Sequence, residues 1–242
     1  MDPNIQGGSY DNPSQAACAH GHYGVAKLLL ERGADPFSQG GRFTNALQAA
    51  LFSESEAIVK LLLEKGVDPN PGNTLQVVAY YGFEAIVTLL LDDGADLNIQ
   101  DKTHRNALHE AAMQGSEAIV NLLLERGTDP NIQGGAFGSA LQAATYHNRE
   151  AIVKLLLEKG ADPNFQDVQG GLFGNALQAA ALRGSGSIVK LLLEKGVDPN
   201  VQGGRYGNAI TAAACNNCWW DDGREVVTRL LLDYGAILSD AP

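Results

Sequence analysis

Two cysteines near the C-terminus have the spacing of a metal-binding or redox pair. Cys215 and Cys218 are separated by two residues, and Trp219 and Trp220 follow directly. Such a pair can ligate a metal ion or exchange a disulfide. A structural zinc site needs about four ligands, and Cys18 is the only other cysteine of the chain. We therefore predict no metal site. The tryptophans are interpreted either as a cover for the exposed apolar end of a helical array or as contacts to a partner.

The histidines and the doubled glycines do not match a known catalytic arrangement. The five histidines do not form an H-E-x-x-H zinc motif. The doubled glycines lack the lysine and the serine or threonine of a phosphate-binding loop, and an aromatic residue follows each pair closely; they are Gly40-Gly41, Gly134-Gly135, Gly170-Gly171 and Gly203-Gly204. No nucleophile has a recognisable base beside it. We predict a protein without catalytic residues or cofactors, and keep as an alternative a groove that gathers such groups without a sequence motif.

The elements that must position these residues are leucine-rich segments that recur along the whole chain. Three consecutive leucines begin at Leu28, Leu61, Leu89, Leu122, Leu155, Leu191 and Leu230, at spacings of 33, 28, 33, 33, 36 and 39 residues. This period, with local insertions and deletions, is typical of a solenoid. In the segment 56–64, apolar residues at helical spacing cover a wide arc opposite Lys60 and Glu64, so the helix has apolar surface for a neighbour on each side. Gly66 stands where a left-handed C-terminal cap belongs.

A shorter, alanine-rich helix is predicted before each leucine-rich helix. The residues in position to cap these helices are Asn45, Asn73, Asn106, Ser139, Asn175 and Asn208. Because small side chains allow close approach, we expect a curved stack with the alanine helices on its inside. The glycine-rich segment 131–138 predicts a projecting β-hairpin between repeats. The third repeat is five residues short, so we expect its hairpin to be missing and to leave a notch.

The segment Asn106-Ala107-Leu108-His109-Glu110-Ala111-Ala112, followed by Gly115, the leucine triplet 122–124 and Gly127, resembles the ankyrin repeat. The family signature T-P-L-H-x-A-A is altered, since asparagine mostly replaces threonine, alanine replaces proline, and glutamine replaces histidine except at His109. The resemblance implies an all-α ankyrin-repeat solenoid of about seven helix–turn–helix layers with projecting β-hairpin loops. We expect one array over residues 1–242, with helix pairs at 12–33, 45–66, 73–94, 106–127, 139–160, 175–196 and 208–235. The glycine-rich repeats also look like those of large fungal receptor-like proteins.

The acidic composition restricts the classes of partner. The chain has 17 basic and 28 acidic residues, a net charge of −11, which argues against nucleic acid and anionic membranes. No apolar run is long enough to span a bilayer, and the N-terminus has no secretory leader. We expect an intracellular, cytoplasmic protein that is monomeric as an isolated array. Residues 2–8 repeat the sequence of residues 129–135, so we also expect that the chain was cut from a longer array.

Two rows of variable side chains are predicted to contact a partner. The residues after each alanine helix vary while the framework hardly changes, and by resemblance to the ankyrin family they face a concave groove. The groove candidates are Phe52, Tyr80, Tyr81, Met113, Tyr146, His147, Leu182 and Arg183, and the hairpin candidates are Arg42, Lys102, Leu172 and Arg205. The hairpin aromatics Tyr10, Phe43, Phe137, Phe173 and Tyr206 fit either a contact role or packing against the next hairpin. We predict a scaffold that binds a protein or peptide. The alternatives are a small-molecule or catalytic groove and a passive spacer or sensor array in a larger receptor.

Overall fold

Pairs of short α-helices joined by tight turns make up the fold. The computed structural model describes residues 2–166, 172–215 and 223–237. These residues contain fourteen helices and, besides single antiparallel bridges, no strand, which confirms the predicted all-α class. The helices are α1 (Pro13–Ala19), α2 (Tyr23–Glu31), α3 (Ala46–Phe52), α4 (Glu56–Glu64), α5 (Thr74–Tyr81), α6 (Glu84–Asp92), α7 (Ala107–Gln114), α8 (Glu117–Glu125), α9 (Ala140–Tyr146), α10 (Glu150–Glu158), α11 (Ala176–Arg183), α12 (Gly186–Glu194), α13 (Ala209–Ala214) and α14 (Arg224–Asp233).

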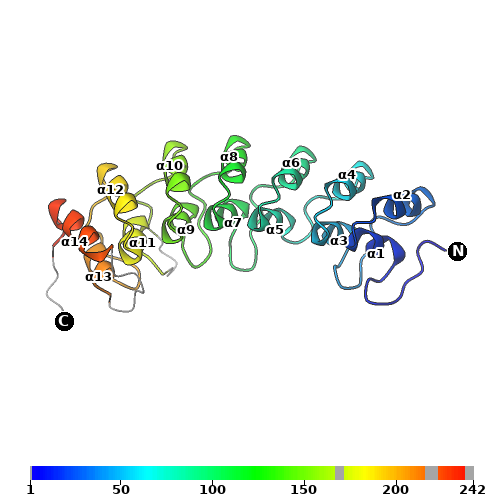
Figure 1. Cartoon of the computed structure of the whole chain (residues 1–242), viewed down its shortest axis with the longest axis horizontal. Coiled ribbons are helices and arrows are strands. Elements are labelled where there is room, and N and C mark those ends of the chain that lie inside the picture. The colour runs from blue at the N-terminus through cyan, green and yellow to red at the C-terminus, as the bar shows by residue number, and fades with distance from the viewer. Residues whose placement is uncertain (1, 167–171, 216–222, 238–242) are drawn as a thin grey trace. The chain divides into compact units, whose positions relative to one another are not determined.

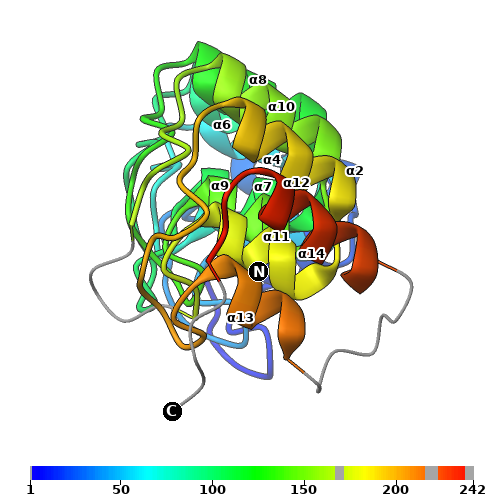
Figure 2. The same ribbon diagram turned by 90° about the vertical axis from the view of Figure 1, so that its left-hand side faces the viewer.

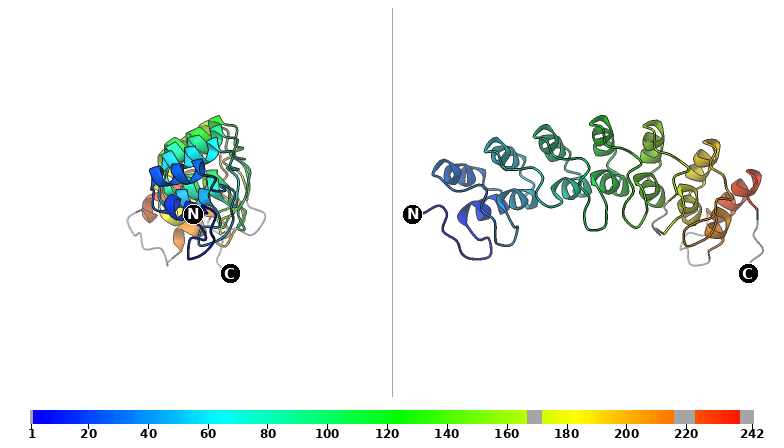
Figure 3. Two further views of the ribbon diagram at one scale, coloured as in Figure 1. Left: turned by 90° about the vertical axis from the view of Figure 1, so that its right-hand side faces the viewer. Right: turned by 180° about the vertical axis from the view of Figure 1, so that it is seen from behind.

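The chain divides into two compact units. Unit 1 is Met1–Leu97 and holds α1 to α6, and unit 2 is Asn98–Pro242 and holds α7 to α14. In each unit the alanine-rich helices follow one another in one layer and the leucine-rich helices in another (Figures 1 and 3). The loops between the helix pairs of unit 2 project to one side of its helices (Figure 2). The single array over residues 1–242 stays a prediction.

Side-chain caps start most of the alanine-rich helices. The Asn45 side chain accepts a hydrogen bond from the Gln48 N–H at 2.8 Å. The predicted caps at Asn106, Ser139, Asn175 and Asn208 are confirmed in the same way. The predicted cap at Asn73 is wrong, because its backbone (φ −115°, ψ 40°) is not extended and its side chain makes no capping bond. A capping residue needs an extended backbone, and the short connection through Pro71 and Gly72 does not provide one.

The middle leucine of each triplet is the most consistently buried inside the series: Leu62, Leu90, Leu123, Leu156 and Leu192 are all 0% exposed, while the outer leucines of α8 and α10 are half-buried. In α4 the exposed fractions of Leu61, Leu62 and Leu63 are 8%, 0% and 7%. In α2, which begins the series, Leu28 is 50% exposed. Burial of these side chains against adjacent repeats is the main source of stability in such a stack. The helices end at glycine in the left-handed region, as predicted; Gly66, for example, has φ +79°.

Polar side chains also tie each repeat to the next. The Asn131 side chain accepts a hydrogen bond from the Asp162 N–H at 2.8 Å and donates one to the Gly160 carbonyl at 3.1 Å. Asn4 and Asn200 make both equivalent bonds, and Asn70 accepts from the Asp96 N–H. A second link comes from the glutamine in the first turn of the alanine helix. Its side-chain amide donates to a backbone carbonyl of the following loop, as Gln178 does to Gly207 at 3.0 Å.

One pair of neighbouring alanine-layer helices is held apart. The short helix α1 packs against α3, and α7, α9, α11 and α13 pack in succession, whereas α3 and α5 do not pack closely on each other. Val77 of α5 occupies the position that is alanine at Ala49 and Ala143 in other repeats. An open hollow lies between α3 and α5, and Val77 is one of the residues that line it.

Candidate interaction surface

The aromatic residues of successive hairpins stack on one another. In unit 2 the ring centroid of Phe173 lies 6.4 Å from that of Phe137 and 6.3 Å from that of Tyr206. In unit 1 the rings of Tyr10 and Phe43 stack at 6.1 Å. Phe173, with a ring on each side, is only 1% exposed. These residues therefore have the structural role that was one of the two interpretations of the sequence.

The doubled glycines of the described hairpins allow neighbouring hairpins to pack closely. A Cβ at Gly41 would lie 2.7 Å from the carbonyl carbon of Tyr10 in the preceding hairpin. A Cβ at Gly134 would overlap the carbonyl oxygen of His104, and one at Gly204 would overlap the backbone of Gly174. Real Cβ contacts are longer than these, so only glycine allows the hairpin backbones to come so close. The described glycine pairs, at 40–41, 134–135 and 203–204, are therefore packing residues.

Several predicted contact residues of unit 2 are packed into this ladder. The Tyr146 ring lies 5.1 Å from the rings of both Phe137 and Phe173, and the Arg183 guanidinium carbon lies 5.1 Å from the Tyr146 centroid. His147 meets Phe137 edge-on at 5.4 Å. Burial, with the charges of Arg149 and Arg183, lowers the pKa of His147. The structure thus brings Tyr146, His147 and Arg183 together, half-buried, as part of the unit's own packing.

The other candidates of unit 2 differ in their exposure. Met113 and Leu182 are half-buried. Lys102, Leu172 and Arg205 are exposed. The backbones of Leu172 and Arg205 link the hairpins, since each donates its N–H to the preceding hairpin, at Ala136 and Leu172 respectively. Their side chains remain free to reach a partner.

Unit 1 presents its aromatic side chains around an open hollow between α3 and α5. Phe52, Tyr80 and Tyr81 are 60%, 43% and 63% exposed. We name the hollow the aromatic cleft. It has a volume of about 350 Å³ and is lined by Phe43, Gln48, Leu51, Phe52, Glu54, Val77, Tyr81 and Phe83. The Phe43 and Phe52 rings lie 4.9 Å apart at one wall, and the Tyr81 and Phe83 rings stack at 5.6 Å at the other.

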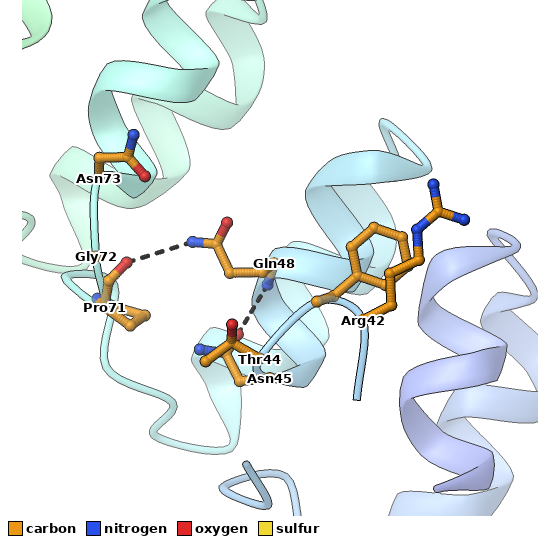
Figure 4. A pocket seen from close by; sticks show the side chains of 8 residues that line it. Arg42, Thr44, Asn45, Gln48, Pro71, Gly72 and Asn73 are labelled. Carbon is orange, nitrogen blue, oxygen red and sulfur yellow. Dashed lines mark hydrogen bonds between the residues drawn. The ribbon is translucent and has the colours of Figure 1, made fainter. Parts of the chain in front are cut away.

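A second hollow lies where the third repeat lacks its hairpin. This notch has a volume of about 310 Å³ and is lined by Arg42, Phe43, Thr44, Asn45, Gln48, Pro71, Gly72 and Asn73. Figure 4 shows Gln48 reaching toward Pro71, to whose carbonyl it donates at 3.3 Å, with Arg42 on its other side. The Arg42 guanidinium carbon lies 5.3 Å from the Phe43 centroid and 5.5 Å from that of Phe52. The notch expected from the short repeat is therefore present, and it shares Phe43 and Gln48 with the aromatic cleft.

The sequence did not single out several residues of these hollows. Val77, Leu51 and Phe83 line the aromatic cleft, although the contact candidates did not include them. Val77 could have been selected from the sequence, because it is larger than the alanine found at this position in other repeats. Glu54 supplies the one acidic group among the lining residues.

The titratable groups with shifted pKa values lie away from both hollows. His109 Nδ1 lies 2.7 Å from the Asn106 side-chain oxygen, and the two side chains form a capping box at the start of α7. Burial, with the charge of Arg105, lowers the pKa of His109 to about 4. Glu110 is buried and pairs with Arg105 at 3.0 Å, and burial raises the pKa of its carboxyl. These groups line neither the aromatic cleft nor the notch, and they hold the start of α7.

The cysteine pair of the sequence is only partly described. Cys215 is half-buried and free, while Cys218, Trp219 and Trp220 lie outside the described residues. Cys18 is fully buried, and burial raises the pKa of its thiol to about 12. In the described ranges, no group of three or more histidine, cysteine, aspartate or glutamate side chains could hold a metal ion. No helix of this part of the chain has the length and apolarity to cross a membrane.

Comparison with known proteins identifies a matching family model and a similar solved structure. A family model described as "Ankyrin repeats (3 copies)" matches residues 1–73, 47–134, 75–167 and 140–240. The crystal structure of the human ASB11 ankyrin repeat domain is similar with a TM-score of 0.76 and 24% sequence identity, over 94% of this chain and 100% of that chain. At this identity the likeness concerns the fold alone. No curated protein matches the chain significantly.

Proposed function

The chain belongs to the ankyrin-repeat family, and from this premise we propose that it is a non-enzymatic module that binds a protein partner through the aromatic cleft of unit 1. Ankyrin-repeat domains generally mediate protein–protein interactions and are typically non-catalytic scaffolds. The observation that carries the proposal is a group of exposed aromatic side chains at one hollow: Phe52 and Tyr81 line it and are 60% and 63% exposed, and the Tyr80 ring, 43% exposed, meets the Tyr81 ring edge-on at 5.1 Å. Exposed aromatic side chains that surround a pocket are the usual anchors of an interface.

The size and lining of the aromatic cleft suit a side chain from a partner. Its volume of about 350 Å³ is near the lower limit for small-molecule pockets and admits one or two apolar side chains. Fully burying one Leu or Phe of the partner there contributes about 1.5–3 kcal/mol before the costs of association. Glu54 at the cleft, the negative faces of the rings and the net charge of −11 favour a basic residue beside that apolar anchor.

Unit 2 contributes exposed side chains in this proposal. Lys102, Leu172 and Arg205 stay proposed partner contacts because their side chains are exposed. Met113, Tyr146, His147, Leu182 and Arg183 are half-buried, so their contact role is limited to the atoms that remain accessible. The energy of binding is therefore assigned chiefly to unit 1.

An enzyme or small-molecule site would need polar groups that converge in an enclosed pocket. Of the residues that line the two described hollows, Arg42 and Glu54 are the charged ones, and they line different hollows. His109 and Glu110, whose pKa values are shifted, line neither hollow. This distribution favours an interaction surface over catalysis.

We also propose an intracellular, cytoplasmic setting, a monomeric state and a fungal origin. The acidic charge supports protein over nucleic acid or anionic membrane as partner. The likeness of the glycine-rich repeats supports the origin. Sedimentation equilibrium tests the monomer, and a concentration-dependent mass would contradict it.

Affinity capture with matched baits tests the proposed function. The wild-type chain, a Phe52→Ala/Tyr81→Ala variant and a Phe37→Ala control are exposed to the same cell lysate, and retained proteins are quantified by mass spectrometry. Phe37 is also an exposed aromatic residue, at 57%, but it does not line the cleft. We expect a protein retained by wild type and control and lost from the double variant. An identical set on all three baits would contradict the proposal.

A further inference from the structure

The hairpins of this chain recognise one another by two repeated contacts. One contact is the ring stack, with centroids 6.1 to 6.4 Å apart for Tyr10–Phe43, Phe137–Phe173 and Phe173–Tyr206. The other is a backbone hydrogen bond between the residues just before the two rings. Arg42 donates to Ser9 at 2.9 Å, Leu172 to Ala136 at 3.0 Å and Arg205 to Leu172 at 3.2 Å. Each hairpin thus offers the next one a ring face and a carbonyl group.

The hairpin of residues 39–45 offers both groups to the notch. The third repeat has Pro71 and Gly72 between Asn70 and Asn73, where the fifth repeat has the seven residues 132–138. No ring of unit 1 stacks on Phe43 from the following repeat, and Phe43 is half-buried where Phe173 is 1% exposed. Among the described residues, no backbone N–H donates to the Arg42 carbonyl. The space that a following hairpin would fill is the notch of about 310 Å³.

We propose that the notch receives an aromatic-bearing turn of the protein partner in place of the missing hairpin. The partner's ring stacks on Phe43, and the N–H of the residue before that ring donates to the Arg42 carbonyl. The side chains of Thr44, Gln48 and Asn73 line the same hollow and supply polar contacts for the turn's backbone. The inference rests on the proposed protein-binding function, but it concerns a separate subsite from the aromatic cleft.

The contacts between the chain's own hairpins also predict the sequence of the turn. In two of the described pairs the second glycine lies against the backbone of the preceding hairpin: Gly41 against Tyr10, and Gly204 against Phe173 and Gly174. A side chain at that position would collide. The partner's turn therefore has glycine two residues before its aromatic residue. This Gly-x-aromatic pattern distinguishes the occupant from an arbitrary apolar segment.

A peptide copied from the chain provides the probe. A cyclised peptide with the sequence of residues 202–208 carries the glycine pair and the tyrosine in a turn, and the same peptide with Tyr206→Ala is its control. Each is titrated into the isotope-labelled full chain, and the amide resonances of Gly72 and Asn73 and the side-chain amide of Gln48 are followed. We expect saturable shifts at these three positions, and a dissociation constant at least tenfold larger for the alanine peptide. Absence of shifts at millimolar peptide, or equal affinity of the two peptides, would overturn the inference.

Two variants of the chain locate the binding site. In the first, Pro71–Gly72 is replaced by a copy of residues 132–138, which restores a hairpin and fills the notch. We expect this variant to lose the peptide-induced shifts, while its Phe52- and Tyr81-dependent capture persists. In the second, Phe43→Leu, we expect peptide binding at least tenfold weaker with the fold intact by circular dichroism, which keeps the test decisive if the first variant does not fold. Peptide binding unchanged in Phe43→Leu would place the site elsewhere and overturn the inference.

The outcomes separate this inference from the proposed function. If capture depends on Phe52 and Tyr81 but the peptide does not bind at Gly72, the inference about the notch is contradicted and the proposed role of the aromatic cleft is supported. Peptide binding at Gly72 with capture insensitive to Phe52 and Tyr81 would support the notch and contradict the aromatic cleft. Self-association of the wild-type chain that the restored hairpin abolishes would identify a second copy of the chain as the occupant, and would overturn the assignment to a different protein.

Discussion

The ring of Phe43, in the loop before α3, lies 4.9 Å from the ring of Phe52, at the last residue of that helix. This contact joins the hairpin row to the row of variable side chains. Phe43 also borders both the aromatic cleft and the notch. In unit 1 the two rows predicted separately from the sequence therefore form one surface, and one aromatic pair stands at its centre.

Tyr146 and Tyr80 occupy corresponding positions near the ends of their helices, but they should respond differently to truncation. Tyr146 packs against Phe137, Phe173 and Arg183, whereas Tyr80 is 43% exposed. We expect Tyr146→Ala to lower the free energy of unfolding by about 2–4 kcal/mol, because it leaves a gap in the stack. Tyr80→Ala should lower it by less than about 1 kcal/mol. Urea denaturation followed by circular dichroism measures both, and equal losses would contradict the packing described for unit 2.

The links between repeats can be tested at Asn131. Asn131→Ala removes the bonds to the Asp162 N–H and the Gly160 carbonyl, and we expect a loss of about 1–2 kcal/mol in the free energy of unfolding. Asn121→Ala is the matched control, because its side chain bonds only to Glu125 one turn along the same helix. The control should change stability by less than about 0.5 kcal/mol. If both variants melt alike, the link between repeats does not stabilise the stack.

The tyrosines and Asn131 also show which features could be predicted from the sequence and which could not. The helices, most caps and the glycine ends depend on neighbouring residues, so spacing and residue type were enough to place them. The bond from Asn131 to Gly160 joins residues 29 apart, and the prediction for the segment 131–138 was a hairpin, with no link to the next repeat. The hollow between α3 and α5 is formed by residues of two different repeats, such as Leu51 and Val77, so it could not be placed from either repeat alone. Exposure of a given aromatic residue likewise depends on whether the next repeat has a hairpin, so Phe52 and Tyr146 looked equivalent in the sequence and are not.

The buried imidazole of His109 predicts a dependence of stability on pH. Its pKa is about 4 in the folded chain and 6.5 for an ordinary histidine, so the unfolded chain binds the proton more readily. The stabilisation is complete above pH 6.5 and is lost as the pH falls toward 4. Between pH 7.5 and 5 we expect the histidine to lower the free energy of unfolding by about 2 kcal/mol.

His109→Gln isolates that contribution, since Gln48, Gln142 and Gln178 occupy the corresponding positions in other repeats. Glu110, whose raised pKa acts in the opposite direction at low pH, is present in both proteins and cancels in the comparison. Denaturation of wild type and variant at both pH values gives the difference. Parallel pH profiles would show that His109 does not titrate on unfolding as described.

The central claim is that the aromatic cleft of unit 1 binds a protein. Its most direct test is the dissociation constant of the purified partner for the wild-type chain, for Phe52→Ala/Tyr81→Ala and for Phe37→Ala, measured by isothermal titration calorimetry. We expect the affinity of the double variant to be at least tenfold weaker, a loss of about 1.4 kcal/mol or more in binding free energy. The affinity of the Phe37→Ala control should stay within twofold of wild type. Equal affinity of all three proteins would contradict the central claim.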